Sequence, residues 1–112
     1  MIFSQDWDEL TRINYLQRWV LVQSILYYEF DKNAVSDFVY DKNAHQLADM
    51  MQACKNVQDS RYYYVFYDYE GSTGCHLKNR LNDVDRDLIM SIVDYGIKHY
   101  KKLYLKEIKN HG

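Results

Sequence analysis

The sequence predicts a mostly helical α+β domain: a helical hairpin, a small aromatic-rich β-element and a long C-terminal helix, within one domain of residues 1–112. Three observations support this fold class. Apolar residues recur every three or four positions before residue 54 and again after residue 83, as on one face of a helix. The chain has no proline, the residue that most often interrupts helices. Between the two helical regions, the segment RYYYVFYDY is rich in aromatic residues that favour β-strands.

The first half of the hairpin is predicted as a helix over residues 6–30, with its N-terminal cap at Ser4 or Asp6. Its second half, WVLVQSILYY, is apolar on most sides, so we expect this to be the most buried helix of the fold. The apolar residues that follow the helical spacing are Trp7, Leu10, Ile13, Leu16, Val20, Leu21, Ile25 and Tyr28.

A polar turn over residues 31–34 leads to the second helix, which completes the predicted hairpin of residues 1–54. Ser36 is a favourable N-cap, and the carboxylate of Asp37 in the first turn interacts favourably with the helix dipole. We expect this helix to end near Cys54. The side chains expected in the core are Phe38, Leu47, Ala48 and Met51.

The β-element is predicted over residues 61–81, after a polar segment that breaks the helical periodicity. Residues 61–69 form its first strand, residues 70–74 (EGSTG) a turn, and residues 75–81 a short return strand. A short aromatic run does not by itself distinguish a strand from a buried helix, so both remain open for residues 61–69.

Asn82 is expected to cap the final helix, over residues 83–109, and the acidic residues Asp83, Asp85 and Asp87 to form its solvated first turns. A helix of this length spans roughly 40 Å, more than a domain of this size. We therefore expect its distal half either to pack on a partner chain, including a second copy of this one, or to project.

Composition excludes several functional classes. The net charge of -2, with 27% charged residues of both signs, lacks the basic bias of proteins that bind nucleic acid through its phosphates. No apolar stretch approaches the roughly 20 residues that cross a bilayer, and the N-terminus does not resemble a signal peptide. We expect a cytoplasmic protein with no membrane contact.

A candidate ligand site lies where the two hairpin helices meet. Asp37, Tyr40 and Asp41 are three or four positions apart and share one side of the second helix. The turn brings Tyr27 and Tyr28 back beside them. Aromatic faces attract a cationic ring, and carboxylates accept hydrogen bonds from amides or ribose hydroxyls. Periodicity alone leaves an alternative without a ligand site. In that alternative, Tyr40 is a core residue and the two aspartates are cap and surface residues.

The same residues resemble a known family. Tyr27, followed by Asp31 and then by Asp37 in a D-x-x-Y-D motif, is similar to the N-terminal (Ia) subdomain of NAD-dependent DNA ligases, over residues 10–52. That subdomain binds the nicotinamide mononucleotide (NMN) half of NAD. The resemblance implies that Tyr27 and Tyr40 contact the nicotinamide, and that Asp37 and Asp41 bind its polar edge and the ribose. The family's recognition positions fall on Tyr27, Tyr28, Asp37, Tyr40 and Asp41.

The chain also departs from the family. Tyr28 replaces a histidine that helps to position the phosphate of the mononucleotide, and Asn33 replaces a proline. The nucleophilic K-x-D-G motif is absent, so the chain cannot ligate DNA by itself. The hairpin followed by an aromatic run and a G-S-T-G turn also resembles small stand-alone ligase-related proteins of phages, and this resemblance implies a place in the host cytoplasm.

The resemblance implies non-catalytic binding of NMN, NAD or a related nucleotide, with no cofactor required. The alternative is a protein-interaction module, such as a viral factor that binds a host protein and uses the hairpin as a scaffold. A nucleotide-converting enzyme with Asp37 or Asp41 as its base is a third hypothesis.

Two further patterns bear on the site. Gly71, Ser72, Thr73 and Gly74 are the candidate phosphate-side loop, with a tight turn as the alternative. Arg61, Lys78 and Arg80 flank that loop and could add positive charge. Asp37, Asp41 and His45 share a helix face but have no evident fourth ligand, so we predict no metal site.

Overall fold

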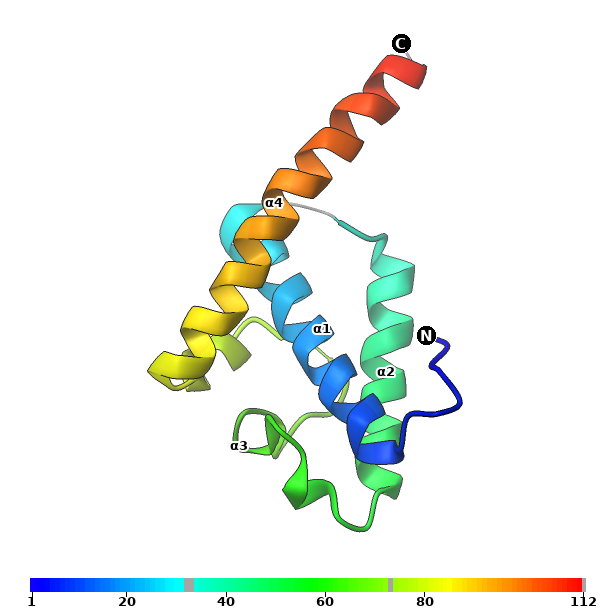
Figure 1. The fold of residues 1–112 in the computed structure, drawn as a ribbon, viewed down its shortest axis with the longest axis vertical. Coiled ribbons are helices and arrows are strands. Elements are labelled where there is room, and N and C mark those ends of the chain that lie inside the picture. Colours follow the sequence, from blue (N-terminus) through cyan, green and yellow to red (C-terminus); the bar gives the residue numbers. More distant parts are fainter. Residues whose placement is uncertain (32–33, 73, 112) are drawn as a thin grey trace.

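The computed structural model describes residues 1–31, 34–72 and 74–111, with side chains described as far as His99. Its four α-helices confirm the mostly helical prediction. Figure 1 shows α1 in the centre, packed against both α2 and α4. The helices are α1 (Glu9–Phe30), α2 (Asp37–Ala53), α3 (Tyr63–Phe66) and α4 (Asp83–His111), with 3-10 helices at Val57–Asp59 and Leu77–Arg80.

Helix α1 begins three residues later than predicted because Asp8 is its cap. The Asp8 carboxylate accepts the backbone N–H of Thr11 at 2.8 Å. Hydrogen bonds from the side chain of Thr11 and then from its backbone lower the pKa of Asp8. Residues 20–26 are all buried, which confirms that the second half of this helix is the core element. Tyr27 and Tyr28 in the last turn are each 47% exposed.

Helix α2 has the predicted cap, since the Ser36 hydroxyl accepts the N–H of Val39 at 3.2 Å. Leu47 and Met51 are in the core, as expected. The prediction for Phe38 is wrong, because this side chain is 75% exposed. Phe38 lies about two and a half turns before Leu47, and is therefore on the opposite side of the helix.

The predicted β-element of residues 61–81 is not present: no strand occurs among the residues that the structure describes. Residues 61–69 contain the short helix α3, and residues 75–81 contain the 3-10 helix Leu77–Arg80. The small β-element was therefore a wrong prediction, and of the two alternatives left open for residues 61–69 the structure has the helix.

The pattern of burial explains this helical outcome. Tyr62, Val65 and Phe66 are buried, at 3%, 0% and 0% exposure, whereas Tyr64 and Tyr67 are exposed. Spacings of three and four, with two adjacent residues buried, fit a helical turn, because a half-buried strand would alternate.

Side chains of α1 also accept hydrogen bonds from backbone N–H groups that, in a strand, would bond to a neighbouring strand. The Asn14 side chain accepts the N–H of Arg61 at 2.7 Å, and the Gln17 side chain accepts that of Tyr62 at 3.1 Å. The chain therefore turns into α3 on the surface of α1.

Helix α4 is capped as predicted, because the Asn82 side chain accepts the N–H of Asp85 at 2.8 Å. Ile89 and Val93 are fully buried in the shared core. The helix continues beyond the end of α1 and gives the protein a longest dimension of 50 Å (Figure 1). Within the described part of the chain, no helix is both long and apolar enough to cross a membrane.

The acidic start of α4 is not uniformly solvated. Asp83 and Asp87 are exposed as expected, but Asp85 is only 1% exposed. Its carboxylate accepts hydrogen bonds from the Arg61 guanidinium at 2.6 Å and from the Tyr64 hydroxyl. Asp85 thus ties the start of α4 to the segment around α3.

Candidate functional site: a pocket at the hairpin

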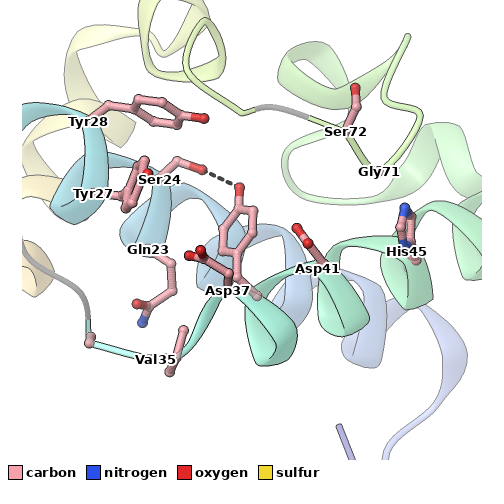
Figure 2. Close-up of a pocket in the computed structure, with 12 residues that line it drawn as sticks. Gln23, Ser24, Tyr27, Tyr28, Val35, Asp37, Asp41, His45, Gly71 and Ser72 are labelled. Atoms are coloured by element: carbon pink, nitrogen blue, oxygen red, sulfur yellow. Dashed lines mark hydrogen bonds between the residues drawn. The ribbon is translucent and has the colours of Figure 1, made fainter.

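A pocket of about 480 Å³ lies between the end of α1, the start of α2 and the loop that follows α3 (Figure 2). This volume is within the range of roughly 300–1,000 Å³ that is typical of small-molecule sites. All five predicted ligand residues line it: Tyr27, Tyr28, Asp37, Tyr40 and Asp41. The remaining lining residues are Gln23, Ser24, Ala34, Val35, His45, Gly71 and Ser72.

Helix geometry produces this convergence. Asp37, Tyr40 and Asp41 face the pocket from the first turns of α2, as their spacing predicts. Asp31 ends α1 in the left-handed conformation, with φ of 50°, and so lets the chain reverse direction. The rings of Tyr27 and Tyr28 meet edge to face, with centroids 4.9 Å apart.

Tyr40 belongs both to the core and to the pocket. Its hydroxyl shares a hydrogen bond of 2.8 Å with that of Ser24, which links α2 to α1. Its ring stacks on Trp19 with centroids 6.0 Å apart. Burial raises the pKa of Tyr40, and the hydrogen bond with Ser24 only partly opposes that shift. At neutral pH this hydroxyl is therefore an uncharged hydrogen-bonding group.

Tyr69 lies behind Tyr40 and was not predicted. Burial raises the pKa of Tyr69, and the neighbouring Tyr40 raises it further. The buried hydroxyl of Tyr69 has no partner of normal hydrogen-bond geometry in the structure as described. Tyr69 thus adds a second neutral phenol to this end of the protein.

Two glycines let the loop after α3 approach the hairpin closely. Gly71 has φ of 84°, and a Cβ atom there would lie 3.0 Å from His45 Cδ2. A Cβ atom on Gly74 would lie 2.5 Å from the Ser24 hydroxyl oxygen and 2.9 Å from that of Tyr40. The loop therefore closes one wall of the pocket. Of the predicted phosphate-side residues, Gly71 and Ser72 line it, Gly74 packs behind it, and Thr73 lies outside the described residues.

The basic residues near this loop are engaged elsewhere. Arg61 pairs with Asp85 at 2.6 Å, Arg80 pairs with Asp68 at 2.6 Å, and Lys78 pairs with Glu29. None of the three is among the residues that line the pocket.

The lining is instead acidic. Two carboxylates, Asp37 and Asp41, line the pocket, and its described lining contains no lysine or arginine. Asp37, Asp41 and His45 all line it, yet nowhere in the described part of the chain do three histidine, cysteine or acidic side chains lie close enough to hold a metal ion. The pocket therefore favours an uncharged or cationic group beside its carboxylates.

Sequence reasoning also missed Gln23 and Ser24. Both are buried, at 7% and 4% exposure, and both line the pocket. A signal was available, since this pair interrupts the otherwise apolar run WVLVQSILYY. Adjacent polar residues inside a buried helix need partners, and Ser24 finds its partner in Tyr40.

Comparison of the chain with protein-family models, with curated proteins and with solved structures gives no match. A functional assignment therefore depends on the pocket and on the resemblance of the residues that line it.

Proposed function

We propose that the pocket binds a pyridine nucleotide, NMN or the NMN half of NAD, without converting it chemically. The observation that carries the proposal is the convergence of three tyrosines and two aspartates on one cavity of about 480 Å³. These are the residues on which the resemblance to the ligase Ia subdomain depends.

The chemistry of the lining suits such a ligand. The nicotinamide ring of NMN is a flat cation, which tyrosine faces attract through the ring quadrupole. The carboxylates of Asp37 and Asp41 favour the positive ring and accept hydrogen bonds from ribose hydroxyls.

The two ends of the pocket differ, which supports one orientation of the ligand. In Figure 2, Tyr27 and Tyr28 lie at one end, and Gly71, Ser72 and His45 lie at the other. We assign the ring to the tyrosine end. The phosphate then lies toward the loop, where backbone amides and the Ser72 hydroxyl are suitable donors. Figure 2 shows Asp41 between Asp37 and His45, on the loop side, so Asp37 is the carboxylate nearer the ring.

Isothermal titration calorimetry with NMN and NAD tests the proposal. The protein is expected to give saturable heats with Kd below about 1 mM. The double variant Asp37→Asn, Asp41→Asn is expected to bind at least about tenfold more weakly, because it removes both charges that favour the cationic ring.

Asp49→Asn is the matched control for charge, because Asp49 is exposed on the same helix and does not line the pocket. It should bind like the unaltered protein. Absence of heat with both ligands would contradict the proposal, as would binding that Tyr40→Ala leaves unchanged.

A second candidate function is association through α4. Val84, Leu88 and Tyr95 are 76%, 44% and 72% exposed, and their spacing places them on one side of the helix. Residues 83–94 carry four aspartates and one arginine, whereas residues 95–111 carry five lysines and one glutamate. Two antiparallel copies of α4 would pair the acidic half of each with the basic half of the other, so the favoured partner is a second copy of this chain.

Sedimentation equilibrium tests this association. A concentration-dependent dimer that weakens as salt is raised is expected, because screening reduces the attraction between the helix halves. The double variant Leu88→Glu, Tyr95→Glu should be monomeric, while Gln52→Glu, an exposed change on α2, should dimerise normally. A monomer at all concentrations in low salt would exclude the candidate.

A further inference from the structure

Two buried glutamines of α1 differ in the hydrogen bonds that their side-chain amides make. Gln17 is fully buried, donates to the Ser60 hydroxyl at 3.1 Å and accepts the N–H of Tyr62 at 3.1 Å. Gln23 is only 7% exposed as a whole residue and forms no hydrogen bond with another described side chain, but its amide atoms are not among the fully buried atoms that lack a partner, so they are open to the pocket. Buried amides in native proteins nearly always have partners. Gln17 therefore has a structural role, whereas Gln23 has a vacant donor and a vacant acceptor.

The unbonded amide of Gln23 lies at the pocket. Gln23 lines the pocket, and Figure 2 shows its amide extending from α1 toward Val35, at the same end as Tyr27 and next to Asp37. This is the end to which the proposed orientation assigns the ring of the ligand. A substituent on that ring that points toward Asp37 and Val35 would meet the Gln23 amide.

We infer that Gln23 is a specificity residue that makes the pocket select a ring bearing a carboxamide over the same ring bearing a carboxylate. This inference rests on the proposed function. A primary carboxamide can donate to the Gln23 side-chain oxygen and accept from its NH2 group at the same time. A carboxylate can only accept, so it would leave the glutamine oxygen facing another oxygen.

The nearby carboxylates of Asp37 and Asp41 also favour a carboxamide over a carboxylate. Asp37 and Asp41 repel a negatively charged substituent but not a neutral amide. Ser24 does not offer the paired donor and acceptor of an amide, and its hydroxyl already shares a hydrogen bond with that of Tyr40. Selection between amide and acid thus depends mainly on Gln23, with the two aspartates reinforcing it.

The test compares NMN with nicotinic acid mononucleotide, which differs from it only in carrying a carboxylate. The unaltered protein is expected to bind NMN roughly ten- to a hundredfold more tightly. In Gln23→Leu, which keeps the approximate shape of the side chain, this ratio should fall severalfold, mainly through weaker binding of NMN. Its ligand-free melting temperature should be about unchanged, because the change removes no hydrogen bond between Gln23 and a described residue.

Gln52→Leu is the matched control, since Gln52 is exposed on α2 and does not line the pocket. It should keep the full ratio. Equal binding of the two mononucleotides by the unaltered protein, or an unchanged ratio in Gln23→Leu, would overturn this inference and leave the proposed function standing. Absence of binding by both mononucleotides would overturn both.

Discussion

Replacement of Phe66 by alanine is expected to lower the free energy of unfolding by about 3–5 kcal/mol. Phe66 is fully buried in the shared core and is one of the largest such side chains. Its ring also meets that of Tyr69 edge to face, with centroids 5.0 Å apart. Alanine would lose the burial of the ring and leave a cavity beneath α3. Since small domains are stable by only about 5–15 kcal/mol, this is a large fraction of the total.

Urea denaturation followed by circular dichroism measures this effect, and neighbouring residues supply the controls. Tyr67→Ala should cost only about 0.5–1 kcal/mol, because Tyr67 is 58% exposed and its main contact is a cation–π interaction with Arg80. Val65→Ala should also be clearly destabilising, since Val65 is fully buried. A strand would bury only one of the adjacent residues Val65 and Phe66, so a negligible cost for either would contradict the helical assignment.

The helices of this protein could be predicted because their signals are local. Ser36 and Asn82 each accept a backbone N–H within their own first turn, so the cap and the start of the helix follow from neighbouring residues. The periodicity of buried residues identifies α1 in the same way. Phe38 shows the limit of this reasoning, because an apolar residue in a helix need not lie on the buried face.

The segment around α3 could not be predicted because distant residues determine its conformation. Its aromatic residues suit either a strand or a buried helix, and local propensity does not decide between them. Asn14 and Gln17 decide it by accepting the N–H groups of Arg61 and Tyr62, more than 40 positions later in the chain. No pattern in the sequence around residues 61–69 indicates those contacts with α1.

In the candidate site, too, some residues could be placed from local sequence signals and others could not. Asp37, Tyr40 and Asp41 could be placed together because they are one helical turn apart on a single helix. Gln23 stands out in the sequence only as a polar residue in an apolar run, and its place in the pocket depends on how α1 faces α2. Tyr69 could not be placed, since its position depends on where the chain passes after α3. The wall formed by Gly71 likewise depends on close packing against His45, which no spacing in the sequence reveals.

Asp85→Ala is expected to lower the free energy of unfolding by about 2–4 kcal/mol. This carboxylate is 1% exposed and accepts hydrogen bonds from the Arg61 guanidinium and the Tyr64 hydroxyl. Hydrogen bonds to a charged acceptor are stronger than neutral ones. We place the expected loss below that for a fully buried ion pair, because Arg61 is about half exposed and water can solvate it once Asp85 is removed.

Asp87→Ala is the matched control for Asp85→Ala, because it also removes an aspartate near the start of α4, but an exposed one. Alanine has a better helix propensity than aspartate, and this adds a similar stabilisation to both variants. The difference between their free energies of unfolding therefore reports the buried contacts of Asp85. Combining Asp85→Ala with Arg61→Ala in urea denaturation should give a loss smaller than the sum of the single losses, by about 1 kcal/mol. Strict additivity would mean that the ion pair adds nothing. In that case Tyr64 and the apolar contacts alone would hold α4 to the segment around α3.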